Sequence, residues 1–179
     1  MKIKDSVRLQ FELMTAKDSE LMFRLDQDPE VMQFINGGKL TSKQEILNVY
    51  IPRMESYTNP DEGWGIWKVT LRQSKEFIGW ILIRPMGFFS DSPEFSNLEI
   101  GWRFKRSSWG KGYATEAATS IKQVLVNKGA LTVLSAVAVE ENSASINIMK
   151  KLGMEFIKKD IHRDPIGDQL AVFYQVEVK

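Results

Sequence analysis

Hydrophobic positions recur along the chain with two different periods, and the period predicts which segments are strands and which are helices. Alternation, or a short apolar run bounded by turn residues, indicates a strand. The expected strands are Val7–Met14, Trp64–Leu71, Phe77–Ile83, Leu98–Phe104, Leu131–Val139, Met154–His162 and Gln169–Val178. Apolar residues three and four positions apart indicate a helix. The expected helices run from Ala16 to about Asp26, from Ser42 to Met54, from Tyr113 to Lys128 and from Ala144 to Leu152.

Capping and helix-breaking residues predict where these segments begin and end. Asp28-Pro29 is expected to stop the first helix, because the residue before a proline disfavours helical geometry. Ser42 with Glu45 has the spacing of a capping box, and Gly129 ends the long helix. Several strands are grouped before that long helix. This order favours one α/β (α+β) domain over residues 1–179, with helices on both faces of a mixed sheet.

Composition excludes several classes of protein. The chain of 179 residues carries a net charge of only +1, so it lacks the bulk charge of a dedicated nucleic-acid binder. It has no cysteine and one histidine, His162, so a thiolate zinc site, a two-histidine metal site and a cysteine nucleophile are excluded and no metal is expected. No apolar run reaches the length of a membrane span or of a signal peptide. We therefore expect a soluble, cytoplasmic protein.

The most informative segment is Trp109–Ala117, which lies between a strand and the long helix. Gly110 and Gly112 let the backbone approach a ligand closely, and the helix start offers free N–H groups and a partial positive charge. The segment therefore predicts a pyrophosphate site, although a tight turn without a ligand would use the same glycines. It matches neither the Walker loop nor the dinucleotide fingerprint.

The letters WGKGYATEA of Trp109–Ala117 resemble the acetyl-CoA loop of the GNAT acetyltransferases, in the RimJ/RimL-like branch. The resemblance continues in Leu98–Trp102, Glu141–Ser145 and Lys151–Met154, and spans about residues 7–174. It implies a mostly antiparallel central sheet, splayed between the fourth and fifth strands, and acetyl-CoA as cosubstrate. The cofactor-binding residues that it implies are Trp102, Arg103, Phe104, Trp109, Gly110, Lys111, Gly112, Tyr113, Ala114, Thr115 and Asn142.

Acetyl transfer to an amine needs a base, and Glu99 is the best candidate. By resemblance Glu99 lies on the strand that admits the thioester, where it acts directly or through a water; the alternative is a charge on an exposed strand face. Without cysteine, direct attack in a ternary complex is favoured. Met149 stands where many relatives carry a tyrosine that protonates the leaving thiolate, so Ser145 becomes a candidate for that proton. Asn142 could equally be an ordinary helix cap, and His162 is expected to be structural or exposed.

Charge is locally uneven. Four cationic residues close to the glycine loop suit the anionic CoA, and two acidic loops suit a cationic acceptor, although both could be solvated loop charge. The cationic residues are Arg103, Lys105, Arg106 and Lys111, and the acidic ones are Glu55, Asp61, Glu62, Asp91, Glu94 and Glu99.

The sequence therefore predicts an acetyl-CoA-dependent N-acetyltransferase whose acceptor is a protein N-terminus or a small cationic amine. A non-catalytic acyl-CoA-binding module of the same fold remains the alternative, since Met149 departs from the family pattern. A nucleotide phosphotransferase would need a metal-binding carboxylate pair that we cannot place. No nucleic-acid or membrane partner is expected. The oligomeric state is not fixed, and a homodimer stays open.

Overall fold

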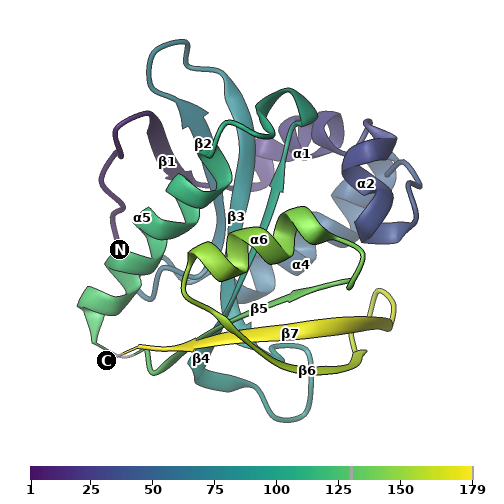
Figure 1. Ribbon diagram of the computed structural model, residues 1–179. Helices are drawn as coiled ribbons and strands as arrows, with labels where there is room; N and C mark the ends of the chain where they lie inside the picture. The colour runs from purple at the N-terminus through teal and green to yellow at the C-terminus, as the bar shows by residue number, and fades with distance from the viewer. Residues whose placement is uncertain (130, 179) are drawn as a thin grey trace.

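The computed structural model describes residues 1–129 and 131–178, so Ala130 and Lys179 of the expected domain lie outside the described residues. It contains a seven-stranded sheet in the order β1-β2-β3-β4-β5-β7-β6 (Figure 1). The strands are β1 (Leu9–Leu13), β2 (Gly65–Leu71), β3 (Phe77–Met86), β4 (Glu94–Phe104), β5 (Val133–Ala138), β6 (Glu155–His162) and β7 (Gln169–Glu177). Neighbouring strands are antiparallel except β4 and β5, which are parallel. The predicted mixed, mostly antiparallel sheet is confirmed.

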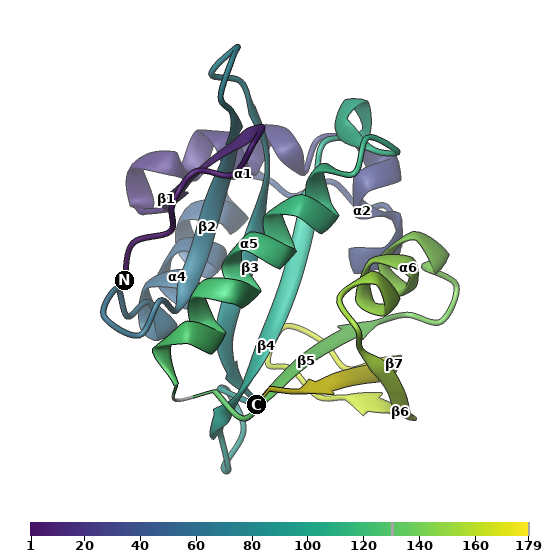
Figure 2. The same ribbon diagram turned by 60° about the vertical axis from the view of Figure 1, so that its left-hand side comes forward.

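Helices cover both faces of the sheet. The α-helices are α1 (Ser19–Leu25), α2 (Pro29–Asn36), α3 (Lys43–Glu45), α4 (Ile51–Tyr57), α5 (Tyr113–Lys128) and α6 (Ser143–Lys151). Shorter turns of 3-10 helix lie at Ala16–Asp18 and Arg106–Ser108, and a π-helical turn, Ile46–Tyr50, joins α3 to α4. In Figure 2, α5 lies in front of the central strands while α1, α2 and α4 lie behind them. None of the helices in the described part of the chain is both long and apolar enough to span a bilayer.

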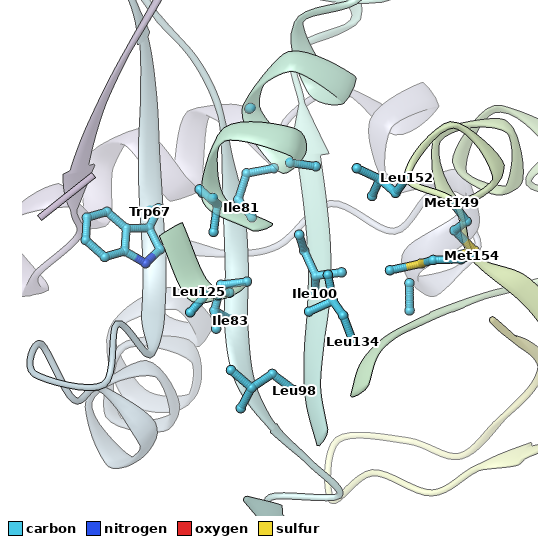
Figure 3. Packing of buried hydrophobic residues seen from close by; sticks show 14 of the residues in the cluster. Trp67, Ile81, Ile83, Leu98, Ile100, Leu125, Leu134, Met149, Leu152 and Met154 are labelled. Carbon is cyan, nitrogen blue, oxygen red and sulfur yellow. The ribbon is translucent and has the colours of Figure 1, made fainter. Parts of the chain in front are cut away.

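The alternation along β3 explains how the two layers are held. Ile81 and Ile83 belong to the main core with α5 and α6, whereas Trp80 and Leu82 pack into a second cluster with α1 and α4. Successive strand residues point to opposite faces, so one strand supplies both clusters. Figure 3 shows the main core, in which Ile81, Ile83 and Ile100 of the sheet lie near Leu125 of α5.

Two boundaries differ from the sequence prediction. The single helix expected over Ala16–Asp26 begins as a 3-10 turn, and a further helix, α2, follows where Asp28-Pro29 was expected only to end one. The Asp28 side chain accepts a hydrogen bond from the Glu30 N–H, and Pro29 occupies the first helical turn, where its missing N–H is harmless. The β3–β4 hairpin is also longer than expected, because pairing continues through an irregularity at Pro85/Met86 to Glu94.

The feature that positions the site is the split between β4 and β5. These strands pair only through Asn97–Glu99 of β4 and Val133–Ser135 of β5. Beyond that point both strands continue, β4 to Phe104 and β5 to Ala138, without pairing to each other. The edge of β4 from Ile100 onward is therefore open on the β5 side, and the predicted splay between the fourth and fifth strands is confirmed.

Candidate active site

A cavity of about 550 Å³ lies beside the split between β4 and β5. Its walls come from β3, β4, β5, α6 and the helices α1, α2 and α4, and from the turn between β6 and β7. Residues from both halves of the chain therefore share one chamber, and Glu99 and Trp102 of β4 lie on its wall.

The glycine loop leads into α5 with the geometry that anion binding needs. Gly110 and Gly112 have φ of 71° and 75°, in the left-handed region that favours glycine, and Gly112 is the N-cap of α5. No side chain caps this end, so the N–H groups of the first turn, which contains Tyr113, Ala114 and Thr115, have no partner within the helix. A Cβ on Gly110 would meet nothing within 4 Å, which leaves the space in front of the loop open.

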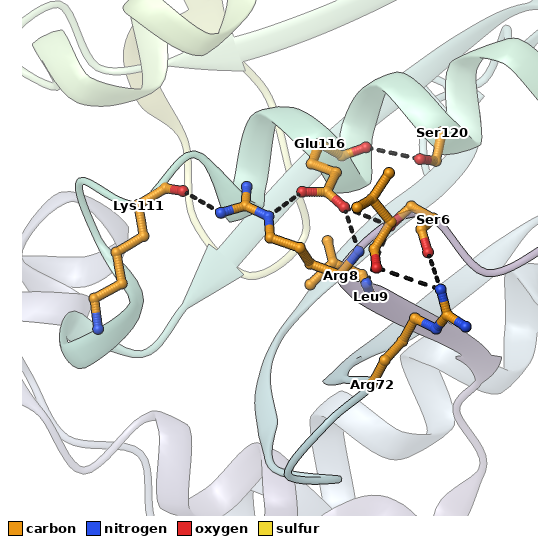
Figure 4. A network of polar contacts seen from close by, with 8 residues as sticks. Ser6, Arg8, Leu9, Arg72, Lys111, Glu116 and Ser120 are labelled. Atoms are coloured by element: carbon orange, nitrogen blue, oxygen red, sulfur yellow. Dashed lines mark hydrogen bonds and ion pairs between the residues drawn. The ribbon is translucent and has the colours of Figure 1, made fainter.

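Arg8, next to β1, holds this loop against the start of α5 (Figure 4). Its Nε donates to Glu116 Oε2 at 2.6 Å, its backbone N–H donates to Glu116 Oε1 at 2.9 Å, and its Nη1 donates to the Lys111 carbonyl at 3.0 Å. The guanidinium also lies 4.4 Å from the centroid of the Tyr113 ring. One side chain thus ties together the loop, the first turn of α5 and the N-terminal strand.

Glu116 is the acceptor at the centre of these contacts. Its Oε1 also accepts the Ser6 hydroxyl at 2.7 Å. Partial burial raises the pKa of Glu116, but the hydrogen bonds from Ser6 and Arg8 outweigh that effect and hold the pKa below its ordinary value. The carboxylate is therefore charged at neutral pH and keeps Arg8 in place.

The cationic residues near the loop are less free than their number suggests. Arg103 pairs with the buried Asp26 at 2.6 Å, Lys105 with Glu76 at 3.1 Å and Arg106 with Asp28 at 3.2 Å. Lys111 forms no ion pair among the described residues and lies in the loop itself. Most of the predicted basic charge is therefore matched by acids, and Lys111 remains to face an anion.

Ser145 and Trp102 meet across the split. The Trp102 Nε1–H donates to Ser145 Oγ at 3.2 Å, which brings the start of α6 against the open edge of β4. Asn142 accepts the Ser145 N–H at 3.1 Å and so acts as the N-cap of α6. Trp109 donates from its ring N–H to the Phe104 carbonyl at 2.9 Å, which fixes the loop to the end of β4.

Glu99 is the last β4 residue that pairs with β5, so its carboxylate lies at the apex of the split. The residue is 8% exposed, and its Oε2 accepts the Arg84 Nε–H at 2.8 Å across the β3–β4 pair. Burial lowers the pKa of Arg84, but the charge of Glu99 outweighs burial and leaves that pKa above its ordinary value. Arg84 is therefore charged, and the partnered Oε2 of Glu99 leaves Oε1 for the cavity.

The ion pair continues away from the strands. Arg84 Nη2 lies 3.7 Å from Asp164 Oδ2 in the β6–β7 turn, and Arg53 of α4 donates to the same oxygen. Tyr57, 5% exposed, completes this side of the cavity, and burial raises the pKa of its hydroxyl to about 12. Tyr57 is therefore uncharged throughout the physiological range, and the charged wall is formed by the two arginines and the two carboxylates.

The family model described as "Acetyltransferase (GNAT) domain" matches residues 8–155. The chain belongs to the GNAT acetyltransferase family. It is 31% identical over 150 residues to the Bacillus subtilis protein named Uncharacterized N-acetyltransferase YnaD. The aligned region covers 81% of this chain and 79% of that protein.

Two further relatives are less alike in sequence. The chain is 26% identical over 155 residues to the FsC-acetyl coenzyme A-N(2)-transacetylase of Aspergillus fumigatus, covering 86% of this chain but just under two thirds, 65%, of that protein. In shape it is similar to RimL, an alpha-N-protein acetyltransferase solved in complex with coenzyme A, with a TM-score of 0.76, 14% identity and coverage of 99% and 98% of the two chains. At that identity the likeness shows the fold.

Several residues of this acetyltransferase that sequence reasoning singled out lie around the split. Trp102, Arg103 and Phe104 occupy the open stretch of β4, and Trp109–Thr115 form the loop and first turn. Ser145 contacts β4 through Trp102, and Asn142 lies on the cavity wall as the N-cap of α6. His162, expected to be structural or exposed, is half-buried and lines the cavity. The sequence offered no local signal for Arg53, Arg84 or Asp164, because these residues lie on separate elements and meet only in the folded chain.

Most acids of the two acidic loops lie away from the wall of the cavity. Of their acids, Glu99 alone is among the described residues that line the cavity. Glu62 pairs with Lys128 at 2.6 Å, and Glu94 accepts a hydrogen bond from the Asn97 side-chain amide at 2.9 Å. A role of these loops in attracting a cationic acceptor stays a prediction, because Phe89 of the second loop packs against Arg53 and Arg84 of the cavity wall.

Proposed function

We propose that this acetyltransferase moves the acetyl group of acetyl-CoA to a primary amine by direct attack in a ternary complex. The observation that carries the proposal is the position of Glu99, at the apex of the β4–β5 split and on the wall of the cavity. A base at that point lies between the open strand edge, which suits a thioester arm, and a chamber that suits an acceptor.

The chain offers acetyl-CoA a set of backbone groups. The free N–H groups behind Gly112 and the positive end of α5 suit the pyrophosphate, and Lys111 adds a cation beside them. The unpaired edge of β4 at Trp102–Phe104 suits the pantetheine arm, which carries amide groups that can pair as a strand would. Asn142 and Ser145 flank the same arm from α6.

The side chains then account for the proton movements. The amine loses a proton to Glu99 Oε1, directly or through a water, while Arg84 holds Oε2 in place. The nitrogen forms a bond to the acetyl carbon and the carbon–sulfur bond breaks. A backbone N–H of the open β4 edge stabilises the charge on the acetyl oxygen. Ser145 Oγ accepts the Trp102 N–H, so its hydroxyl can relay a proton: it gives its own proton to the leaving sulfur and takes the second proton of the attacking nitrogen, while Glu99 returns the first proton to solvent.

The alternative function is a non-catalytic acyl-CoA-binding module of the same fold. Met149 favours it, because this residue on the cavity wall cannot donate a proton to a leaving thiolate. The two functions make different predictions for release of free CoA.

The experiment incubates the full chain with acetyl-CoA and a panel of amines and N-terminal peptides. Free CoA is followed with a thiol reagent, which gives no background from the protein because the chain has no cysteine. Amine-dependent release, with an acetylated product seen by mass spectrometry, supports the enzyme. Tight binding of acetyl-CoA without amine-dependent release supports the binding module and refutes the proposal.

A further inference from the structure

Two buried arginines from different elements converge on one end of the cavity. Arg53 of α4 and Arg84 of β3 both lie against Phe89, with guanidinium carbons 3.8 Å and 5.5 Å from its ring centroid. Their side chains are only 12% and 8% exposed, yet both line the cavity. Two cations held this close and this deep need anions near them.

The anions present do not use all of the donors. A guanidinium has five N–H groups, and among the described residues Arg53 donates one hydrogen bond, to Asp164, and Arg84 one, to Glu99. Among the described residues, the buried side-chain polar atoms that lack a hydrogen-bond partner are Thr41 Oγ1 and Arg103 Nε, and neither belongs to this pair of arginines. The remaining N–H groups of Arg53 and Arg84 therefore reach the open volume of the cavity that both residues line.

The charges of this cluster decide which acceptor fits it. Arg53 and Arg84 are balanced by Glu99 and Asp164, so the cluster is neutral before an acceptor enters. An acceptor with only an ammonium group adds an unmatched positive charge to a buried site, and the mismatch persists when the proton moves to Glu99. An acceptor that also carries a carboxylate keeps the sum at zero in both states.

We infer that the acceptor is an amine whose carbon also carries a carboxylate, as in an α-amino acid. Arg53 and Arg84 bind this carboxylate in place of Asp164. The inference rests on the proposed function. Arg84 and Glu99 are opposite each other on adjacent strands, and Arg84 Nε lies 2.8 Å from Glu99 Oε2, so an amine at Glu99 and a carboxylate at Arg84 must lie close together, as they do when one carbon carries both. Tyr50, Trp80 and Leu82 on the cavity wall then face the rest of the acceptor, which favours an apolar side chain.

The first test compares matched acceptors that differ only in the carboxylate. Phenylalanine and phenethylamine form one pair, leucine and isoamylamine another, and a polyamine and a peptide N-terminus complete the panel. We expect kcat/KM for each amino acid to exceed that of its matched amine by about tenfold or more, since charge-assisted hydrogen bonds are the strong ones. Equal use of both members, or preference for the polyamine or peptide, overturns the inference and leaves the proposed function standing. Failure to acetylate any amine overturns both.

The second test uses two variants with opposite expected effects. Arg53→Gln should raise KM for the amino acid about ten- to hundredfold and lower it for the matched amine, because the variant removes a positive charge that disfavours a bare ammonium. Asp164→Asn should lower KM for the amino acid, because the variant removes the charge that competes for the arginines. A purely structural role would impair both substrates in both variants, and that result refutes the inference.

Controls keep the second test interpretable. Arg24→Gln removes an arginine from an exposed pair with Glu20 on α1, away from the cavity, and should change neither substrate. Thermal denaturation of each variant reports on folding. If Arg53→Gln does not fold, calorimetry of the wild-type chain with CoA present decides: binding of phenylalanine tighter than phenethylamine supports the carboxylate site, and the reverse order refutes it.

Discussion

Replacing Glu99 by glutamine should have two effects: the acceptor loses its base, and Arg84 loses its charged partner. Glutamine keeps the size of the side chain and can still accept the Arg84 Nε–H, but it cannot take a proton from an amine. Loss of a general base lowers kcat by roughly 10²–10⁴-fold, which corresponds to about 3–5 kcal/mol of transition-state stabilisation. Affinity for acetyl-CoA should hardly change, because Glu99 lies at the opposite end of the split from the glycine loop.

The same change also removes one partner of a buried ion pair. Such a loss destabilises a protein by about 3–5 kcal/mol. Asp164 remains 3.7 Å from Arg84, so we expect the lower end of that range, about 3 kcal/mol, or a fall in Tm of about 6–12 °C. A loss of activity alone would therefore not show that Glu99 is the base.

The double variant Glu99→Gln/Arg84→Gln resolves the ambiguity. It removes both charges, so no buried arginine lacks its partner and most of the lost stability should return. If Glu99 is the base, kcat at saturating acceptor stays low in the double variant. The assay is release of free CoA at pH 7, with Tm measured on the same samples. Recovery of kcat together with Tm would refute the base role and leave Glu99 as the residue that positions Arg84.

Three further predictions concern the rest of the site. Gly112→Val should weaken acetyl-CoA binding strongly with the fold intact, because a β-branched residue resists φ of 75° at the N-cap of α5; unchanged affinity by calorimetry would remove the loop from the mechanism. The pKa of Glu116 is lowered in the folded chain, so its contribution to stability is present above the ordinary glutamate pKa and is lost as the pH falls through the folded value; Glu116→Gln should flatten the acid limb of Tm against pH. Neutralising four loop acids together should leave the acceptor KM unchanged, because none of them lines the cavity; a raised KM in steady-state assays would instead show that these loops steer a cationic acceptor. The four are Asp61, Glu62, Asp91 and Glu94.

The parts of the fold that the sequence predicted best are those with local punctuation. The helix Tyr113–Lys128 has the expected bounds because Gly112 and Gly129, both left-handed, mark its two ends. The helix α2 was missed because Asp28-Pro29 reads equally as the end of one helix and as the cap and first turn of the next. A pair such as Asp28-Pro29 predicts a helix boundary but does not show whether the helix lies before it or after it.

The site was predictable only in part, for a different reason. Motif resemblance led to Glu99 and to the loop, but the partners of Glu99 depend on strand register and on the place where a turn reaches a helix. Arg84 is 15 residues from Glu99 in the chain, and Arg53 is 111 residues from Asp164. Counting charges by segment likewise does not show which acids are already paired, as Glu62 is with Lys128.

The long separation of Arg53 and Asp164 has a consequence for the order in which the molecule is assembled. Contacts between residues near in sequence form fastest, and β2, β3 and β4 are consecutive antiparallel neighbours. The β6–β7 turn that carries Asp164 is synthesised after β2, β3, β4 and α4. A growing chain can therefore build its central hairpins, α4 and Glu99 well before the far wall of the cavity exists. The acceptor chamber is completed only after these central elements, so chains synthesised as far as β4 should lack the pocket that selects the acceptor.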